Sequence, residues 1–314
     1  MLEGRSNRGE EQNPGMNISI IIASYNRASA LRQFLQELDR QIVPEGAEWE
    51  VLIVDNNSSD ETRAVAESFA TLNPQRFKYV FEGRRGKSLA LNAGIQKAAG
   101  EILVFTDDDC VPNSDWLACI LDEFASDSSL SVVGGRVELY NQQDKPVSIR
   151  TSRERKVVSS SDLLFSLLIG CNMSIRRTVF DVVMEFDPFL GPGTKMGAVF
   201  EDVDFLYRAF KRGLKLIYSP KVLVYHNHGR RTDTEIQALN KKYAVGRGAF
   251  YCKHILSADR DVLRMAYWEV SSLARTLSKE LFTGKAIADE KRILWALLVG
   301  AGSRLVRNPR LRRI

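Results

Sequence analysis

The sequence predicts an α/β fold with a doubly wound, mostly parallel sheet of the Rossmann-like type, and two observations lead to this prediction. Short runs of β-branched residues alternate with helical stretches between residues 17 and 105. These runs are apolar throughout, which is typical of parallel strands covered by helices on both faces. Ligands of such sheets bind beyond the carboxyl ends of the strands.

The first third of the chain is expected to hold four strands joined by three helices. The strands are predicted at residues 17–23, 49–55, 77–81 and 101–107, and the helices at 28–41, 61–70 and 88–98. Polar clusters at 24–27, 55–58 and 107–109 follow three of these strands. We therefore expect the three clusters to meet in one crevice.

The middle of the chain continues with both kinds of element. A helix is predicted near 114–124, strands at 131–140 and 171–177, a helix at 201–212, and strands at 214–218 and 221–226. Residues 186–199 hold two prolines and three glycines, so they are predicted to form a flexible loop. A loop of this kind beside a ligand crevice is a candidate lid.

The length of 314 residues suits one large domain with an appendage. We predict a disordered leader at 1–16, an α/β domain at 17–233, and a basic amphipathic helical extension at 234–314. Residues 241–314 contain 16 Lys and Arg against 6 Asp and Glu. This excess suits an anionic partner, either nucleic acid or lipid, or a solvated tail. The basic residues near the end are Arg304, Arg307, Arg310, Arg312 and Arg313.

The extension also carries an apolar stripe at helical spacing. We expect this stripe to pack in the core, with membrane contact as the alternative. Its members are Leu263, Tyr267, Val270, Leu273, Leu277 and Leu281.

Three features bear on the location of the protein. Residues 1–15 lack the apolar stretch of a secretory signal. The four cysteines are far apart and form no CxxC pair, which indicates reduced thiols. The longest apolar run, 293–302, has about half of the ~20 residues that a transmembrane helix needs. Together they predict a cytoplasmic protein that does not span a bilayer.

Three successive acids, Asp107, Asp108 and Asp109, follow the fourth predicted strand. Such a cluster is costly unless a cation neutralises it. In an extended chain Asp107 and Asp109 point to one side and Asp108 points away. Carboxylate oxygens suit Mg²⁺ or Mn²⁺, which also binds a diphosphate. An acidic turn that caps the next helix is the alternative interpretation.

A second acid pair, Glu201 and Asp202, stands at the start of a predicted helix, directly after the glycine-rich loop. One carboxylate there could remove a proton from an acceptor hydroxyl while the other positions it. Capping of the helix N-terminus, where acids interact favourably with the helix dipole, explains the pair equally well.

Two histidines and one basic cluster complete the candidate groups. His226 and His228 close the last predicted strand, where an imidazole could coordinate the cation or serve a structural role. The cluster Arg-Arg-Gly-Lys at 84–87 opens a predicted helix, whose free N–H groups favour a phosphate. Its spacing is not that of a Walker A motif, and no GxGxxG follows the first strand, so a classical NTPase or NAD site is disfavoured.

Taken together, these residues resemble the family 2 glycosyltransferases, inverting enzymes of the GT-A fold. Five segments carry the resemblance over residues 17–229, in the order and spacing of the family: ISIIIASYNR, VLIVDNNSSDET, GKSLALNAGIQKAAGEILVFTDDDCVP, GCNMSIRR and FEDVDFLYRAFKRGLKLIYSPKVLVYHNHG. The resemblance implies a GT-A type sheet and a metal-dependent transfer of sugar from a nucleotide sugar, UDP-sugar by default, to an acceptor hydroxyl.

The resemblance also implies roles for single residues. Asp202 would be the catalytic base with Glu201 beside it. The ligands of Mg²⁺ or Mn²⁺ would be Asp109, Asp107, and His226 or His228. The donor would be bound by Ser24, Tyr25, Asn26, Arg27, Asp55, Asn57, Gly86, Lys87, Asn92, Asp107 and Asp108. One departure from the family is the bulky Phe200 before the acid pair, where many members have Gly or Thr.

The family favours a glycan or lipid-linked acceptor in cell-surface glycan synthesis, with no nucleic acid as partner. The basic extension is then expected to lie peripherally on anionic lipid at the inner face of the cytoplasmic membrane. Two other functions remain open. A nucleotidyltransferase normally has a glycine-rich loop after its first strand, which residues 23–27 lack. A non-catalytic nucleotide-sugar-binding scaffold would tolerate loss of the acids that this chain retains.

Overall fold

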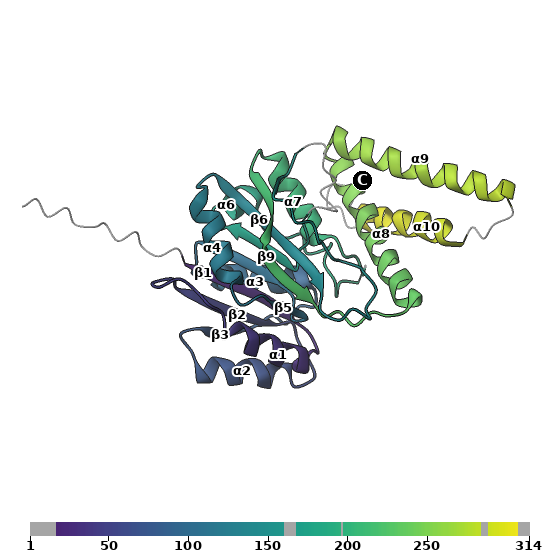
Figure 1. Cartoon of the computed structure of the whole chain (residues 1–314). Helices are drawn as coiled ribbons and strands as arrows, with labels where there is room; N and C mark the ends of the chain where they lie inside the picture. Colours follow the sequence, from purple (N-terminus) through teal and green to yellow (C-terminus); the bar gives the residue numbers. More distant parts are fainter. Residues whose placement is uncertain (1–16, 160–167, 196, 284–287, 307–314) are drawn as a thin grey trace, which may run out of the picture.

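The computed structural model describes residues 17–159, 168–195, 197–283 and 288–306. Within these residues an open sheet of nine strands is flanked by helices, and the C-terminal helices stand to one side of it (Figure 1). The strand order is β3-β2-β1-β4-β8-β6-β9-β5, with β7 beside β9. The predicted α/β class is confirmed.

The amino-terminal half of the sheet is parallel. Its neighbouring strands are β3 (Phe77–Phe81), β2 (Trp49–Asp55), β1 (Ile18–Ser24) and β4 (Ile102–Thr106). The helices between them are α1 (Ala28–Leu38), α2 (Thr62–Leu72) and α3 (Lys87–Lys97). These seven elements agree closely with the predicted ones, because uniformly apolar strands and amphipathic helices give distinct sequence patterns.

The second half of the sheet is mixed, since β8 runs antiparallel to both of its neighbours, β4 and β6. The strands here are β5 (Cys110–Pro112), β6 (Leu130–Leu139), β7 (Lys156–Val157), β8 (Asn172–Arg176) and β9 (Lys215–His226). The helices are α4 (Trp116–Ser126), α6 (Val179–Val183) and α7 (Glu201–Lys211).

Each face of the sheet carries its own apolar core, because successive strand residues point to opposite faces. On β1, Ile20 and Ile22 pack in the core that contains residues of α1 and α4, whereas Ile21 packs in the core with residues of α3 and α7. All three side chains are fully buried, and each contributes about 1.5–3 kcal/mol. The two cores hold the carboxyl ends of the strands in fixed positions.

The last strand differs from the prediction. Residues 214–218 and 221–226 were expected to form two strands, but they belong to the single strand β9. Its pairing with β6 is interrupted next to Arg136. There the side-chain amide of Asn172 donates to the carbonyls of Arg136 and Val222, both at 2.9 Å. Because a side chain satisfies acceptors that the irregular pairing leaves free, the strand continues through the break.

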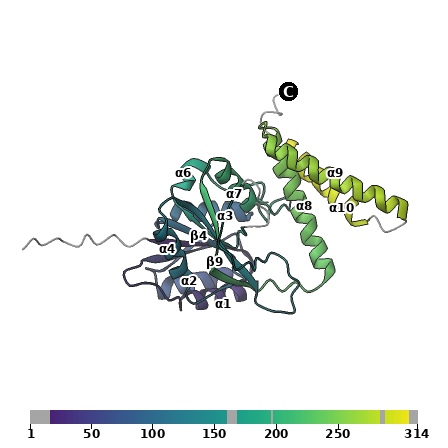
Figure 2. The ribbon, with the colours of Figure 1, turned by 45° about the horizontal axis from the view of Figure 1, so that its top comes forward.

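The chain ends in three long helices, α8 (Asp233–Ile255), α9 (Arg260–Thr283) and α10 (Ala288–Val306). Figures 1 and 2 show them beside the α/β unit, with α10 packed on α8. Their contact is close, because a Cβ on Gly248 or Gly300 would lie 2.0 Å from a carbonyl oxygen of the facing helix. Among the described residues, no helix is long and apolar enough to cross a membrane.

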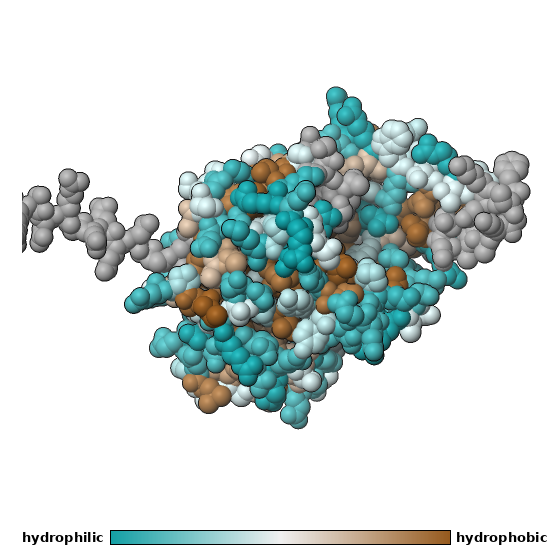
Figure 3. Space-filling model, viewed as in Figure 1, coloured by the Kyte–Doolittle hydropathy of each residue, from teal (hydrophilic) through white to brown (hydrophobic). Residues whose placement is uncertain are grey.

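The apolar stripe on α9 is more exposed than predicted. Leu263, Tyr267 and Val270 are 53%, 67% and 44% exposed, whereas Leu273 packs against the core. The prediction of core packing is therefore wrong for the first three members of the stripe, and the side chain of Leu281 lies outside the described residues. On the face shown in Figure 3, hydrophobic residues form separate patches, some of them near the C-terminal helices.

Buried ion pairs hold α7 against α8. The carboxylate of Asp204 has no exposed surface, and it accepts from Lys253 at 2.8 Å and from His254 at 2.9 Å. Burial opposes its ionisation, yet Lys253 and His254 hold the pKa of Asp204 far below its usual value. Asp187 joins this network by pairing with Lys253 at 2.8 Å and with Arg304 at 3.0 Å.

The pairing of Arg304 with Asp187 corrects one expectation. Arg304 was predicted to face an anionic partner together with the other arginines at the end of the chain, but its guanidinium binds a carboxylate of this protein. The remaining four arginines of that group lie outside the described residues.

Candidate active site

A polar pocket of about 240 Å³ opens at the carboxyl ends of β1, β2 and β4. The three polar clusters that were expected to share a crevice each contribute to it. Its walls are formed by Ala23, Ser24, Tyr25, Arg27, Asn56, Arg85, Lys87, Asp107, Asp108, Asp109, Pro192, Gly193 and Arg230. The loop predicted at residues 186–199 thus supplies part of the wall.

Asp108 faces this pocket, contrary to the prediction that it points away. The strand β4 ends at Thr106, so the alternation of an extended chain does not continue through the acids. Asp108 accepts a hydrogen bond from the hydroxyl of Ser24 at 2.6 Å and pairs with Nε of Arg27 at 2.8 Å. Burial raises the pKa of Asp108 to about 7, against the attraction of Arg27.

Two cations of the protein balance the acids. The guanidinium of Arg27 bridges Asp108 and Asp109, with Nη2 at 2.9 Å from the Asp109 carboxylate. The ammonium of Lys87, at the first residue of α3, pairs with Asp107. Because each acid already has a cationic partner, a bound metal ion would have to compete with Arg27 for Asp109.

His226 lies beside Asp109, with Nε2 at 3.4 Å from the carboxylate, and its Nδ1 lies 3.4 Å from the carbonyl of Ser148. Burial opposes a charge on the ring, but Cys171 and Asp109 raise the pKa of His226 to about 9. Burial likewise opposes ionisation of Asp109, yet His226 lowers its pKa to about 2. The two side chains therefore form an ion pair at neutral pH.

His228 is turned to a different partner. Its ring centroid lies 5.0 Å from that of His226, and its Nδ1 accepts from the backbone N–H of Arg230 at 2.9 Å. The carboxylate of Asp144 lies 3.8 Å from the same nitrogen. Burial lowers the pKa of His228. Of the two histidines predicted as metal ligands, only His226 contacts the acid cluster.

The donor atoms fit a hard divalent cation. Ligand atoms of Asp109, Cys110 and His226 lie within 4.8 Å of one another. Contact with Cys171 and burial raise the pKa of the Cys110 thiol well above its usual value, so the thiol stays protonated. The carboxylate of Asp109 remains, and the imidazole of His226 can join it once the ring loses the proton that its raised pKa gives it. Carboxylates are the ligands that Mg²⁺ and Mn²⁺ prefer. Asp109 and His226 are the residues of this group that could hold such an ion, whereas Asp107 lies outside the group and pairs with Lys87.

Tyr25 forms an exposed platform at the pocket. The guanidinium of Arg85 lies 3.2 Å from the centroid of its ring. Aromatic rings and guanidinium planes are surfaces on which nucleic bases stack. The loop that carries Tyr25 is fixed by Asn26, whose φ is 51° and whose Oδ1 accepts from the N–H of Ser59 at 2.7 Å.

Five of the predicted donor-binding residues do not line the polar pocket, namely Asn26, Asp55, Asn57, Gly86 and Asn92. Asn92 is buried and binds both backbone groups of Phe186, so it anchors the start of the loop at 186–199. Asp55 is buried and accepts from the N–H of Ser58 at 2.9 Å.

Gly86 and Asn57, which also lie outside the lining of the polar pocket, shape loops. Gly86 adopts a φ of 142°, a conformation open mainly to glycine, and its N–H donates to Asn56 at 2.8 Å. Asn57 has a φ of 62° and donates to the carbonyl of Gly83. None of these five residues lines the polar pocket, and their contact with the donor stays a prediction.

Glu201 and Asp202 open α7 near Lys87. Asp202 accepts from the backbone N–H groups of Gly170 at 2.9 Å and of Val203 at 2.8 Å. Glu201 is buried and lies 3.8 Å from the ammonium of Lys87. Burial raises the pKa of Glu201 to about 8, against the attraction of Lys87. Glu201 is thus mostly protonated at neutral pH.

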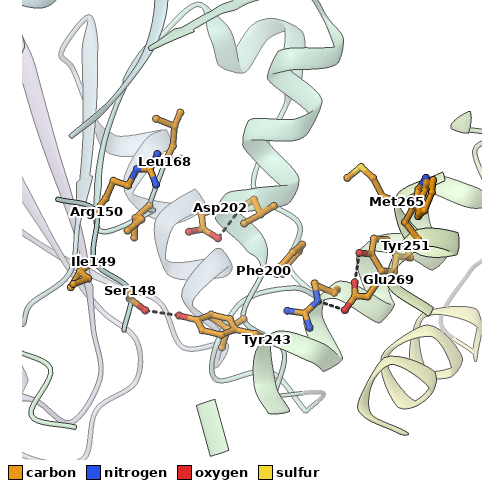
Figure 4. A pocket seen from close by; sticks show the side chains of 15 residues that line it. Ser148, Ile149, Arg150, Leu168, Phe200, Asp202, Tyr243, Tyr251, Met265 and Glu269 are labelled. Atoms are coloured by element: carbon orange, nitrogen blue, oxygen red, sulfur yellow. Dashed lines mark hydrogen bonds and ion pairs between the residues drawn. The ribbon is translucent and has the colours of Figure 1, made fainter. Parts of the chain in front are cut away.

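Adjacent spaces that share lining residues lie between the acid cluster and this acid pair. Lys87 and Asp107 line both the polar pocket and a small space behind it. Asp202 lines that small space and also a larger cavity on its other side (Figure 4). The structure therefore brings the two predicted acid clusters, far apart in the sequence, to the walls of adjacent spaces.

Two residues of the polar pocket were not among the predicted site residues, although Asn56 belongs to the polar cluster at 55–58. Asn56 stands between two residues that were singled out, and its amide donates to the carbonyls of Glu82 and Arg84. Arg230 follows Gly229, whose φ of 70° turns the chain after β9. The position of Asn56 at a strand end was a usable signal, whereas nothing in the sequence indicates that Arg230 returns to the pocket.

Comparison with known proteins defines the class of this protein. Residues 19–183 match the family described as Glycosyl transferase family 2, and residues 102–302 match Glycosyl transferase family group 2. The first match alone spans more than half of the chain. The protein is a glycosyltransferase. It belongs to glycosyltransferase family 2, as the sequence resemblance indicated.

Curated relatives agree with this assignment. The glycosyltransferase AglE of Haloferax volcanii is 28% identical over 255 residues, which cover 80% of this chain and 77% of the relative. The succinoglycan biosynthesis protein ExoM of Rhizobium meliloti is 27% identical over 218 residues, which cover 68% of this chain and 67% of the relative.

Solved structures share the fold. The mannosyltransferase PcManGT of Pyrobaculum calidifontis, in complex with GDP-Man and Mn²⁺, matches with a TM-score of 0.63 at 21% identity, over 95% of this chain and 83% of that one. TarS 1–349 of S. aureus, in complex with UDP-GlcNAc, matches with a TM-score of 0.52 at 21% identity, over 74% and 66% of the two chains. At this identity the likeness establishes the fold.

Proposed function

We propose that this protein is a metal-dependent, inverting glycosyltransferase that moves a sugar from a nucleotide diphosphate sugar to a hydroxyl of a glycan or lipid-linked acceptor in cell-surface glycan synthesis. The relative ExoM, a succinoglycan biosynthesis protein, supports a product of this kind. GDP-Man and UDP-GlcNAc are bound by two proteins of the same fold, and we take a UDP-sugar as the default donor.

The observation that carries this proposal is a row of adjacent spaces, with shared lining residues, that reaches from one acid cluster to the other. At one end are Asp107, Asp109 and Lys87, a set of charges suited to a cation and a diphosphate. At the other end is Asp202, at the edge of a larger cavity. A sugar bound between the two clusters would have its leaving group on one side and a carboxylate on the other.

The proposed mechanism is a direct displacement. Asp202 would accept the proton of the acceptor hydroxyl, whose oxygen attacks the anomeric carbon from the face opposite the diphosphate. The N–H of Gly170 would keep the Asp202 carboxylate in position. Lys87 would lie beside the departing phosphates. A divalent cation held by Asp107, Asp109 and His226 would stabilise the charge that develops on them.

The raised pKa of Glu201 supports Asp202 as the base. A carboxyl whose pKa is about 8 is mostly protonated at neutral pH, so it cannot accept a further proton from the acceptor. Asp204 has no exposed surface, is paired with Lys253 and His254, and lines neither the small space nor the larger cavity. Glu201 would instead act as a neutral hydrogen-bonding neighbour of Lys87.

We further propose that the enzyme works in the cytoplasm at the inner face of the cytoplasmic membrane, attached peripherally through α10. Five exposed apolar residues recur on one side of this helix, Trp295, Leu298, Val299, Leu305 and Val306. An amphipathic helix with basic residues can lie in a membrane interface without spanning it. Lys291, at the start of α10, is exposed and basic.

The experiment that tests the proposal compares the wild-type enzyme with Asp202→Asn. Wild type, given a nucleotide sugar and Mn²⁺ but no acceptor, should hydrolyse the donor slowly. With an acceptor present, it should transfer the sugar with inversion, so that NMR shows the anomer opposite to that of the donor. Asp202→Asn should lower the turnover number about 10²–10⁴-fold and change donor affinity only a few-fold. Asp39→Asn, at an exposed carboxylate, is the control. Unchanged turnover in Asp202→Asn would exclude this carboxylate as the base.

A further inference from the structure

The larger cavity lies between the α/β unit and the C-terminal helices and has a volume of about 810 Å³. Asp202 lines it from the start of α7, Arg150 from the segment before β7, and Met265 and Trp268 from α9. In Figure 4, Arg150 and Asp202 lie on one side of the space and Met265 on the other. Volumes of this size are typical of sites for organic ligands. The cavity is therefore large enough to receive part of an acceptor.

Most side chains around the cavity are apolar, among them Ile149 and Met265. The polar groups near Met265 are bonded to one another. The carboxylate of Glu269 accepts from the hydroxyl of Tyr251 and pairs with Arg247 at 3.0 Å. Because these groups already have partners, they offer little to the hydroxyls of a sugar, whereas an apolar chain would lose nothing there.

Arg150 is the exception to this pattern. Among the residues that the structure describes, no carboxylate pairs with its guanidinium, and its Nε is buried without a hydrogen-bond acceptor. Its guanidinium carbon lies 5.7 Å from the centroid of the Tyr218 ring. A buried donor atom without an acceptor is costly, while Arg150 as a whole is only partly buried and a guanidinium binds phosphate oxygens in a bidentate manner. An anionic group of a ligand would satisfy it.

We propose that this cavity binds the acceptor and that the acceptor is an anionic amphiphile. Its phosphate-like group lies at Arg150, its apolar chain runs between α8 and α9 past Met265 and Trp268, and its reacting hydroxyl lies at Asp202. This inference rests on the proposed function, which it narrows from any glycan or lipid-linked acceptor to one class. Trp268 is 63% exposed, so it stands at the mouth through which the chain leaves.

The chemistry at Asp202 is balanced without further reactants. The acceptor hydroxyl gives its proton to the Asp202 carboxylate, and its oxygen forms a bond to the anomeric carbon. The bond from that carbon to the nucleoside diphosphate breaks, and its electron pair leaves with the diphosphate oxygen. The product is the glycosylated amphiphile, still held by its chain until it leaves past α9.

Binding of simple amphiphiles tests the cavity directly. Calorimetry of the full chain with n-alkyl phosphates from butyl to decyl, below their micellar concentrations, should give affinities that rise about two- to fourfold for each methylene added. Decyl phosphate should bind about tenfold or more tightly than the neutral decyl glucoside, because only the phosphate pairs with Arg150. Affinity that does not depend on chain length would overturn the inference.

Three variants separate the contact of the phosphate with Arg150 from the contact of the apolar chain with Met265. Arg150→Met should remove the advantage of decyl phosphate over decyl glucoside and keep the dependence on chain length. Met265→Glu should abolish the dependence on chain length, since it places a charge on the apolar wall. Leu263→Glu, on the same helix but outside the cavity and 53% exposed, is the matched control and should leave both properties unchanged. Equal loss in Leu263→Glu and Met265→Glu would contradict the assignment.

Failure of this inference is distinguishable from failure of the proposed function. Donor hydrolysis without acceptor needs no occupant of the cavity, so it reports on the function alone. If hydrolysis occurs but soluble oligosaccharides serve as acceptors and Met265→Glu transfers to them normally, the amphiphile is excluded and the function stands. If amphiphiles bind as described but no donor is hydrolysed, the cavity assignment holds as a binding site and the transferase proposal fails.

Discussion

The backbone N–H of Gly170 donates a hydrogen bond to Oδ2 of Asp202 at 2.9 Å, and the two residues touch so closely that no side chain fits between them. A Cβ on Gly170 would lie 2.5 Å from Oδ2 and 2.7 Å from the Cβ of Asp202. These distances are far below any van der Waals contact. The position of the proposed base therefore depends on the absence of a side chain two residues before β8.

Gly170→Ala should lower the turnover number by about 10–100-fold while donor affinity stays within a few-fold. The added methyl displaces Asp202, and a displacement of about 1 Å at a reacting group can cost 10²-fold in rate. Steady-state kinetics and calorimetry with the donor nucleotide measure the two effects. Gly302→Ala, where an added Cβ meets nothing within 4 Å, is the control and should be active. Full activity in Gly170→Ala would show that this contact does not position the base.

Glu201→Gln should stabilise the fold in a pH-dependent way. The folded-state pKa of Glu201, about 8, lies above its ordinary value of 4.5. Ionisation therefore costs stability as the pH rises from 4.5, and the cost is complete above pH 8. The neutral Gln avoids this cost, so the variant should melt roughly 2–4 °C or more above wild type near pH 8.5, with the gain vanishing near pH 4.5.

Thermal unfolding at several pH values measures this difference. Glu61→Gln, at an exposed carboxylate, is the control and should show the same change at every pH. The same Glu201→Gln preparation should keep most of its transfer activity at neutral pH, since the side chain it replaces is already mostly neutral there. A gain in melting temperature that grows toward acid pH would contradict the assignment.

The parallel half of the sheet was predictable, because the apolar sequence of each strand matches its burial in the folded protein. Uniformly apolar strands such as β1 are buried on both faces, and the sequence records this directly. The break beside Arg136 was not predictable, because it depends on the amide of Asn172, which comes from another strand. The exposure of Tyr267 could not be foreseen either, since an amphipathic stripe looks alike whether it meets a core or solvent.

In the candidate site, too, local sequence predicts some features and contacts between distant segments determine the others. Strand-end residues such as Asp109 were foreseen, because the carboxyl ends of parallel strands converge. The orientation of Asp108 was not, since it follows from where β4 stops and from the guanidinium of Arg27. The engagement of His228 with Asp144 depends on a contact between distant segments. Sequence thus located the acids, and packing decided which way each one faces.

Donor binding should require a divalent cation. Asp107, Asp108 and Asp109 and the diphosphate are all acidic, and Arg27 alone already serves two of the three carboxylates. UDP or GDP, titrated into the protein with Mn²⁺, should bind about tenfold or more tightly than with EDTA, a difference of about 1.4 kcal/mol or more. Asp109→Asn should remove most of this gain and Asp39→Asn none. Equal affinity in EDTA and Mn²⁺ would exclude the metal from donor binding.

The proposed attachment through α10 calls for point variants and not for removal of the helix. α10 packs on α8 so closely that a Cβ on Gly300 would lie 2.0 Å from the carbonyl of Val245. A chain shortened before α10 would expose the facing side of α8, so its loss of binding could reflect unfolding. Substitutions confined to the exposed side of α10 avoid this difficulty.

Trp295→Glu combined with Leu298→Glu should reduce co-sedimentation with anionic vesicles at least about tenfold. Both residues are exposed, at 65% and 58%, so the change removes apolar contact area and adds two negative charges without disturbing the packing on α8. Each charge near an anionic surface is worth on the order of 1 kcal/mol. Leu72→Glu, at an apolar residue that is 83% exposed on α2, is the matched control and should sediment like wild type. The circular dichroism and melting temperature of the double variant should equal those of wild type. If wild type and double variant sediment equally, or if neither does, α10 is a packing helix and the peripheral attachment is wrong.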